Sequence, residues 1–329
     1  MSKIVFKDVM KIYPGNEKNA VNNVNLEVNS GEFIVFLGTS GCGKTTLLKM
    51  TNRLYAQTKG QIIIDDTDTR ELPVNELRRK IGYVIQQSGL FPHMTVEKNI
   101  AVVPDMLGWD KKKIAQRIEE LLELVHLDPK VYRSRYPRQL SGGEQQRIGL
   151  ARALAADPPI MLMDEPFGAI DAITRTKLQD ELIHIQKKLH KTILFVTHDV
   201  DEALRLADKI VIMKDGDIVQ FDTPLNIIAK PKNDFVRDLI GGDDIIRQIS
   251  LINISDAMQK VTETITVDST LTISDTSDLK SALAAMLKSR TEQLYVVDER
   301  TQVIGIINFA QIQALLSPNK KEKHALEVH

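Results

Sequence analysis

The feature that most constrains this chain is a glycine-rich segment, Gly38 to Thr45, which reads G-T-S-G-C-G-K-T. It follows the apolar run Phe33 to Leu37 and precedes a predicted helix from Thr46 to Arg53. A strand, a loop and a helix in this order let backbone N–H groups surround phosphate groups, and the helix N-terminus adds its dipole. The pattern predicts a layered α/β domain that binds ATP or GTP. Lys44 would reach the β- and γ-phosphates, and Thr45 would hold Mg²⁺.

A second apolar run, Ile160 to Met163, ends in the adjacent carboxylates Asp164 and Glu165. A buried strand in such a domain delivers its last residues to the same sheet edge as the phosphate loop. We therefore expect Asp164 to bind Mg²⁺ through water. Glu165 is placed to polarise the attacking water as a general base, a role worth roughly 10²–10⁴ in rate.

The composition limits which classes of partner the protein can bind and in which cellular compartment it can work. The chain has 329 residues, enough for two domains, and its net charge of −1 implies no global attraction to nucleic acid or anionic lipid. The single cysteine, Cys42, excludes an internal disulfide framework and fits a reducing compartment. No apolar run reaches the roughly 18–20 residues that a bilayer requires, and the N-terminus lacks a signal-peptide core. We expect a cytosolic protein whose membrane contact comes through a partner.

The order of predicted elements indicates two folded parts. The expected strands of the first part are 4–6, 24–28, 61–65, 82–86, 160–163, 192–196, 208–213 and 217–221, with a helical region between about 95 and 157. After a charged, glycine-containing linker, a smaller α+β unit combines a helix carrying Leu279, Ala282, Leu283, Met286 and Leu287 with strands 293–297 and 302–307 and a helix over 309–316. The predicted boundaries are 1–240 for the first domain (helical subdomain about 87–157), 241–252 for the linker, 253–317 for the second domain and 318–329 for a disordered tail.

A further segment, Leu140 to Arg147, reads L-S-G-G-E-Q-Q-R. Ser141 and the two glycines precede a predicted helix from about Glu144 to Ala156, so their N–H groups form a second anion site. Since one chain already has a phosphate loop, this site should serve the γ-phosphate bound by another chain. Dimerisation is then part of the mechanism.

The phosphate loop, L-S-G-G-E and M-D-E-P together resemble the nucleotide-binding subunit of an ATP-binding cassette (ABC) transporter, over about 3 to 239. The resemblance implies an ABC-type P-loop NTPase fold with a mixed sheet core and a helical subdomain, and two subunits that sandwich two ATP molecules head to tail. It also implies that Tyr13 stacks on adenine, that Gln86 (or Gln87, one position later) senses the γ-phosphate and Mg²⁺, that Asp171 crosses the dimer interface, and that His198 contacts the γ-phosphate.

The candidate residues form three groups. The catalytic candidates are Lys44, Gln86, Glu165 and His198. The Mg²⁺ candidates are Thr45, Gln86 and Asp164. The candidates for nucleotide contact are Tyr13, Gly38, Thr39, Ser40, Gly41, Cys42, Gly43, Lys44, Thr45, Thr46, Ser141, Gly142, Gly143, Glu144 and Asp171.

The second unit, over about 268 to 316, resembles a cystathionine-β-synthase (CBS)-type module. A cassette fused to such modules is similar to the glycine betaine/carnitine/choline importers, whose modules sense ionic strength or bind cyclic di-AMP. The chain departs from that pattern, because it has room for one module instead of a pair. It also has Asn308 and Gln311 where a ribose usually meets Thr or Ser and Asp. Both departures favour a dimerisation or vestigial role as much as nucleotide sensing.

The resemblance implies an ATPase at the cytoplasmic face of the membrane that powers a separate permease, with an extracytoplasmic solute-binding protein and no nucleic acid partner. An importer of another small solute with a vestigial module remains an alternative. A soluble cassette ATPase acting on ribosomes or DNA would usually show two cassettes, coiled-coil insertions or a basic surface. A regulator with an idle ATPase conflicts with the intact set of Lys44, Asp164, Glu165 and His198.

Overall fold

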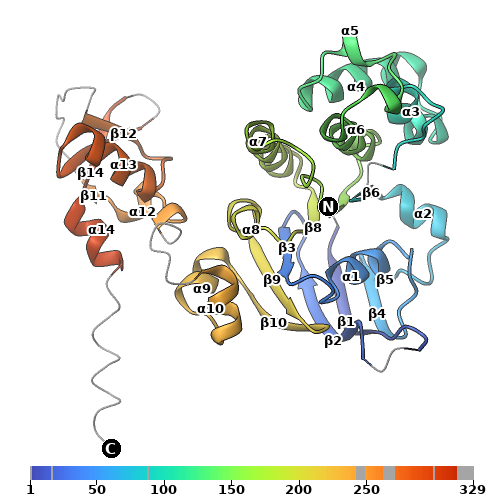
Figure 1. The fold of residues 1–329 in the computed structure, drawn as a ribbon, viewed down its shortest axis with the longest axis horizontal. Helices are drawn as coiled ribbons and strands as arrows, with labels where there is room; N and C mark the ends of the chain where they lie inside the picture. The colour runs from blue at the N-terminus through green and yellow to red at the C-terminus, as the bar shows by residue number, and fades with distance from the viewer. Residues whose placement is uncertain are drawn as a thin grey trace, which may run out of the picture. The chain divides into compact units, whose positions relative to one another are not determined.

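The computed structural model describes residues 2–15, 18–86, 89–241, 249–261, 271–298 and 301–316. The chain divides into two compact units, Met1–Thr223 and Pro224–His329. Each is described by itself (Figure 1).

The centre of the first unit is a six-stranded sheet in the order β10-β9-β3-β8-β7-β6. The five strands from β9 to β6 are parallel, and β10 pairs antiparallel with β9. Strands β3, β7 and β8 are buried along their whole length, as is typical of parallel strands covered on both faces. The bounds are β3 (Phe33–Gly38), β6 (Ile81–Val84), β7 (Ile160–Asp164), β8 (Thr192–Val196), β9 (Lys209–Lys214) and β10 (Asp217–Asp222).

A second, antiparallel sheet has the order β2-β1-β4-β5. Its bounds are β1 (Ile4–Lys11), β2 (Val21–Val28), β4 (Lys59–Ile64) and β5 (Thr67–Asp68). The buried side chains of this sheet share one core cluster with helix α1 (Lys44–Thr51) and with one face of the six-stranded sheet. The helix that follows the phosphate loop is thereby held from two sides, which fixes the position of its N-terminus.

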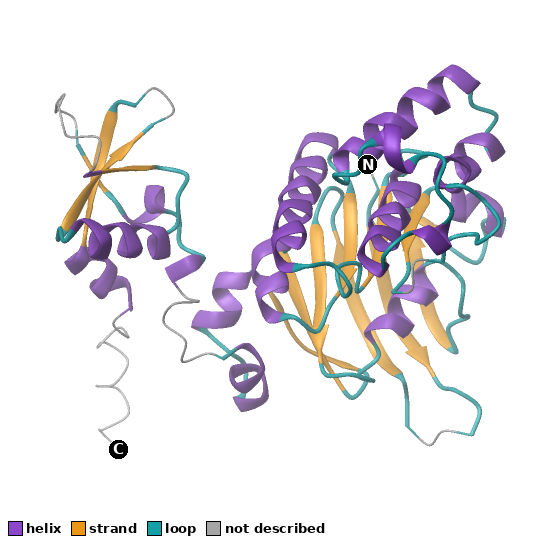
Figure 2. Ribbon diagram, turned by 45° about the horizontal axis from the view of Figure 1, so that its top comes forward, coloured by secondary structure: helices purple, strands orange, loops and turns teal. Residues whose placement is uncertain are grey.

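The helices of the first unit lie in separate groups, as Figures 1 and 2 show. Helices α3, α4 and α6 pack on one another, and α5 packs on α4. The bounds are α2 (Val74–Arg79), α3 (Val96–Met106), α4 (Lys111–Leu124), α5 (Pro129–Tyr132), the 3₁₀ turn η1 (Pro137–Gln139), α6 (Gly142–Leu154), α7 (Ala172–Leu189) and α8 (Val200–Leu206). On α4, Ile114, Ile118, Leu121 and Leu122 are buried at helical spacing, which confirms the predicted periodicity.

The second unit has a four-stranded sheet in the order β11-β14-β13-β12. Strands β12 and β13 are parallel, whereas β14 pairs antiparallel with β11 and with β13. Leu279, Leu294 and Ile307 belong to its apolar core. The bounds are α9 (Pro224–Ala229), α10 (Asp234–Ile240), α12 (Ile254–Ala257), β11 (Gln259–Lys260), β12 (Thr272–Ser274), α13 (Leu279–Ser289), β13 (Gln293–Val297), β14 (Val303–Asn308) and α14 (Phe309–Leu316).

The expected strands of both units are present, and strands 192–196 and 293–297 have the predicted bounds. Helix α6 begins at Gly142 instead of Glu144, because Ser141 caps it. On α13, Leu287 is 72% exposed, so the predicted apolar face is only partly buried. The division between the units falls after Thr223, whereas the predicted domain boundary follows residue 240. That boundary remains a prediction, and most of the predicted linker and the whole tail 318–329 lie outside the described residues.

Candidate nucleotide site

The phosphate loop leaves the carboxyl end of β3 and requires glycine at two positions. Gly38 (φ +156°) and Gly43 (φ +108°) have backbone conformations that L side chains rarely adopt. A Cβ at Gly38 would overlap the carbonyl oxygen of Met213, and a Cβ at Gly43 would overlap that of Ala20. The loop is therefore packed against two neighbouring backbones and can pass tightly around a ligand.

The Lys44 side chain lies over this loop and is 6% exposed. Its Nζ donates to the carbonyl oxygens of Gly38 (2.7 Å) and Thr39 (2.9 Å). Helix α1 starts at Lys44, and no side chain caps its N-terminus. Free N–H groups at a helix start, together with a buried ammonium, make a site suited to phosphate. Ser40 and Gly41 are exposed and Cys42 is buried, so the loop presents its rim to solvent.

Thr45 and Asp164 meet at the sheet edge, as the sequence predicted. The Thr45 hydroxyl donates to Asp164 Oδ1 over 2.7 Å. Burial raises the pKa of the Asp164 carboxyl, and the Thr45 hydrogen bond opposes that shift. A hydroxyl beside a buried carboxylate provides hard oxygen donors, which is the chemistry that Mg²⁺ requires. These residues fit a magnesium site.

Glu165 stands at the end of β7 with its carboxylate held from two sides. Gln86 Nε2 donates to Glu165 Oε2 (3.0 Å), and His198 Nδ1 lies 3.2 Å from Glu165 Oε1. The Glu165 backbone is left-handed (φ +47°), and its N–H donates to the carbonyl oxygen of Val196 (3.0 Å). Such a conformation is uncommon outside glycine and clusters at functional sites. The three predicted catalytic residues Gln86, Glu165 and His198 are thus brought together, and Gln87 lies outside the described residues.

Tyr13 lies close to the helix that follows the loop. Its hydroxyl is 3.4 Å from Thr46 Oγ1, and its ring meets Tyr55 edge to face at 6.0 Å between centroids. Lys11 Nζ is 5.1 Å from the centre of the Tyr13 ring. The aromatic ring is therefore placed beside the start of α1, and its contact with adenine stays a prediction.

The L-S-G-G-E segment forms a capped helix start. The Glu144 N–H donates to Ser141 Oγ, and the Ser141 N–H donates to Glu144 Oε2 (2.6 Å), a reciprocal capping box. The Tyr132 hydroxyl donates to Glu144 Oε1 (2.5 Å) and holds the pKa of Glu144 below its usual range. The Glu144 carboxylate is thus engaged within its own subdomain. Because the Ser141 N–H is already donated to Glu144, this segment can offer an anion the Gly142 and Gly143 N–H groups and the Ser141 hydroxyl.

Asp171 is the N-cap of α7 and accepts a hydrogen bond from the Thr174 N–H (3.0 Å). It is exposed, and these bonds lower the pKa of its carboxyl. The Gly143 backbone packs near Ala169, two residues before Asp171. The start of α6 and the Asp171 segment are therefore neighbours.

Sequence reasoning did not assign two polar residues that support this site, Gln146 and Glu202. Gln146 is 8% exposed and bonds both to the Gln86 carbonyl oxygen and to the Ala169 N–H. Buried Glu202 accepts from the Thr197 hydroxyl (2.7 Å), next to His198. For Gln146 a signal was available, because it follows the L-S-G-G-E motif. For Glu202 no motif or spacing in the sequence distinguishes it from a surface carboxylate.

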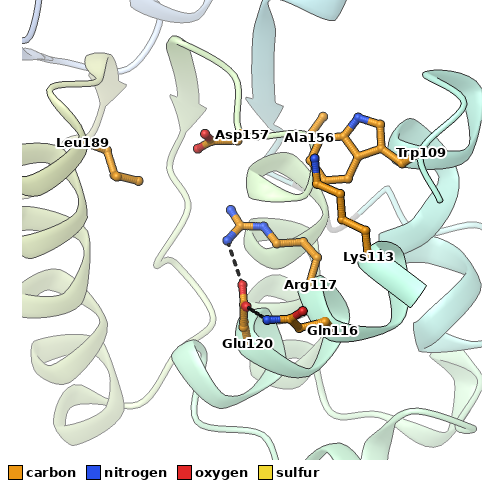
Figure 3. A pocket seen from close by; sticks show the side chains of 8 residues that line it. All are labelled: Trp109, Lys113, Gln116, Arg117, Glu120, Ala156, Asp157 and Leu189. Atoms are coloured by element: carbon orange, nitrogen blue, oxygen red, sulfur yellow. Dashed lines mark hydrogen bonds and ion pairs between the residues drawn. The ribbon is translucent and has the colours of Figure 1, made fainter. Parts of the chain in front are cut away.

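A separate cavity of about 510 Å³ lies in the same unit and contains none of the predicted site residues (Figure 3). Trp109, Lys113 and Arg117 line it, with Glu120 bonded to Arg117 and to Gln116.

No described helix has both the length and the apolar character needed to span a bilayer.

The parallel sheet, the phosphate loop at the end of β3 and the carboxylates at the end of β7 define a P-loop nucleoside triphosphatase. Residues 21–168 match the family model described as ABC transporter. The carnitine transport ATP-binding protein OpuCA of Listeria monocytogenes is 50% identical over 309 residues, covering 93% of this chain and 75% of that protein. The glycine betaine uptake system ATP-binding protein YehX of Escherichia coli is 45% identical over 310 residues, covering 94% of this chain and 98% of that protein.

A solved structure, the dimeric form of a bacterial ABC transporter cassette, superimposes with a TM-score of 0.63 at 36% identity and covers 67% of this chain and 98% of that one. The chain belongs to the ABC transporter family and is an ATP-binding ATPase subunit of that family.

Proposed function

We propose that this chain hydrolyses ATP to power uptake of a quaternary amine of the glycine betaine, carnitine and choline type through a separate permease. The observation that carries the catalytic part is Glu165, held by Gln86 and His198 beside the Thr45–Asp164 pair. The named solutes of the relatives support the solute class. The chain itself contacts no solute in this proposal, because selection belongs to the permease and an extracytoplasmic binding protein. Its place is then the cytoplasmic face of the membrane.

In this proposal the loop N–H groups and Lys44 bind the phosphates, and Tyr13 stacks on adenine. Thr45, Gln86 and Asp164 would hold Mg²⁺, which neutralises phosphate charge. Glu165 orients and deprotonates the attacking water, while His198 contacts the γ-phosphate. Two chains close head to tail, so that the Ser141 hydroxyl and the Gly142 and Gly143 N–H groups of one chain face the γ-phosphate on the other, with Asp171 at the interface.

Glu165→Gln tests the catalytic part. It preserves the size of the side chain but removes its basicity, so we expect an ATP-bound dimer on light scattering and at least a hundredfold slower hydrolysis. Lys44→Ala is the matched control, which should remain monomeric with ATP. A Glu165→Gln chain that stays monomeric at saturating MgATP would contradict the head-to-tail mechanism.

Uptake of labelled glycine betaine, carnitine and choline by cells lacking this chain tests the solute class. Restoration by the parent chain and not by Lys44→Ala is the expected result. Restored ATPase without restored uptake of any of the three would favour the alternative, an importer of another small solute.

For the second unit we propose a single CBS-like module, over about 253–317. The Asn308 N–H donates to Gln311 Oε1 (2.7 Å) and the Gln311 N–H donates to Asn308 Oδ1 (2.8 Å), so both side chains cap α14. Leu287 and Phe309, 72% and 50% exposed, line a cavity of about 670 Å³. These features favour pairing with a second copy over binding of cyclic di-AMP. Calorimetric titration of the full chain with cyclic di-AMP at two salt concentrations tests this, and saturable micromolar binding would refute it.

A further inference from the structure

Gln146 occupies an unusual position on α6, five residues after the Ser141 cap. Its side chain is almost fully buried, although it is an amide. A buried amide requires partners for both of its ends, since an unpaired polar group in the interior is destabilising.

Both ends of the Gln146 amide are bonded, and the two partners lie on different segments. The Ala169 N–H donates to Gln146 Oε1 over 2.9 Å. Gln146 Nε2 donates to the backbone carbonyl oxygen of Gln86 over 3.4 Å. One partner is a donor and the other an acceptor, so only an amide satisfies both; a carboxylate lacks the donor, and an apolar side chain lacks both groups.

The two partners are the segments that position Glu165. Gln86 is the residue whose side-chain Nε2 donates to Glu165 Oε2. Ala169 follows Glu165 in the same turn, in which the Gly168 N–H donates to the Glu165 carbonyl oxygen over 3.4 Å. Gln146 therefore contacts the chain on both sides of the carboxylate without contacting the carboxylate itself.

A second bond from α6 strengthens this connection. Arg152 Nη1 donates to the carbonyl oxygen of Gly89 over 2.7 Å, three residues beyond Gln86. The same rigid helix thus holds the chain at Gln86 and again at Gly89. Because α6 begins at the Ser141–Gly143 anion site, a shift of this helix would affect both that site and the chain segment at Gln86 and Gly89.

We propose that Gln146 is a positioning residue for hydrolysis: it ties the orientation of α6 to Gln86, and through Gln86 to the Glu165 carboxylate. This inference rests on the proposed ATPase function. In the position that α6 has in the single chain, Gln146 already holds Gln86 against Glu165, and a γ-phosphate on the partner chain would keep α6 in that position. When α6 is displaced, the Gln86 carbonyl oxygen loses its donor and the Gln86 amide leaves Glu165.

The test compares kcat and KM for ATP in the full chain and two variants. Gln146→Leu removes both bonds at nearly constant volume, and Gln146→Glu keeps the acceptor for the Ala169 N–H but removes the donor toward Gln86. We expect kcat to fall about tenfold in both variants, with KM within twofold, since neither bond touches the phosphate loop. Gln145→Glu is the matched control: its side chain donates to Pro137 and Leu140 within the helical subdomain, and its kcat should stay within twofold.

A double-mutant cycle separates positioning from general packing. In a Gln86→Ala background, Gln146→Glu should change kcat less than twofold, because the residue through which it acts is gone. An unchanged kcat in Gln146→Glu, or an undiminished tenfold fall in the Gln86→Ala background, would overturn the inference. Should Gln146→Leu unfold, Gln146→Glu alone decides. Absence of hydrolysis by the parent chain would instead count against the proposed function.

Discussion

Two of the loop glycines, Gly41 and Gly43, allow the packing of the phosphate loop to be measured by comparing the same substitution at both positions. Both have positive φ, +79° at Gly41 and +108° at Gly43. A Cβ at Gly41 would meet nothing within 4 Å, whereas a Cβ at Gly43 would overlap the carbonyl oxygen of Ala20. Alanine at the first position therefore tests backbone conformation alone, and alanine at the second adds a collision with backbone.

The expected costs differ by several fold. An L residue in the left-handed region costs about 1–2 kcal/mol, so Gly41→Ala should lower the free energy of unfolding by about 1 kcal/mol. At Gly43 the φ value lies beyond the left-handed region, which costs up to about 3 kcal/mol. Overpacking adds about 1–3 kcal/mol, because a backbone carbonyl cannot rotate away. We expect a loss of about 3–5 kcal/mol for Gly43→Ala.

The only tryptophan of the chain, Trp109, makes this measurable in the first unit, to which it belongs. Its fluorescence during urea denaturation reports the unfolding of that unit without a contribution from the second. A Gly43→Ala chain whose free energy of unfolding lies within about 0.5 kcal/mol of Gly41→Ala would refute the reasoning, since the two sites would then be equivalent. Gly41→Ala should also retain nucleotide binding.

Three further changes have clear expected results. Tyr132→Phe should lower the free energy of unfolding by about 0.5–1.5 kcal/mol at neutral pH, and this loss should shrink as the pH falls through the lowered pKa that Glu144 has in the parent chain. The same change should raise the pKa of Glu144 in an NMR titration; an unchanged pKa would contradict the hydrogen bond. Burial raises the pKa of Glu202, so its ionised form destabilises the native state relative to the unfolded chain. Glu202→Gln should therefore raise the denaturation midpoint at pH 8, with the gain shrinking toward pH 5; a gain independent of pH would contradict this. Leu279→Ala, in the core of the second unit, should cost that unit about 2–5 kcal/mol by circular dichroism while leaving the tryptophan transition unchanged.

Local motifs predicted the site because they encode backbone geometry directly. The loop from Gly38 to Thr45 and the strand ending in Asp164 each specify a strand end, and parallel strands bring such ends to one edge. The Thr45–Asp164 hydrogen bond follows from that rule. His198, after a buried strand, arrives at the same edge for the same reason.

Other features depend on contacts that no local pattern encodes. The left-handed backbone of Glu165 occurs together with its bond to Val196 on the neighbouring strand, a contact that depends on the strand order. Gln146 reaches 60 residues back to Gln86, and its helical spacing alone would also suit a solvent-facing glutamine. The bonds of the Glu144 carboxylate to Ser141 and Tyr132 are also contacts that the motif does not encode, and the expected contact of Glu144 with nucleotide stays a prediction.

Under the proposed function, the arrangement around Glu165 explains how its carboxylate can be held in place and still act as a base. A carboxylate offers about four lone-pair sites, and Gln86 and His198 each approach a different oxygen. Both oxygens are therefore oriented, yet each retains a lone pair for a water proton. Because the Glu165 side chain is 24% exposed, water has access to the carboxylate in the single chain. Closure by a second chain then has to supply γ-phosphate contacts and exclude bulk water, and the base needs no new orientation as long as α6 keeps Gln86 in place.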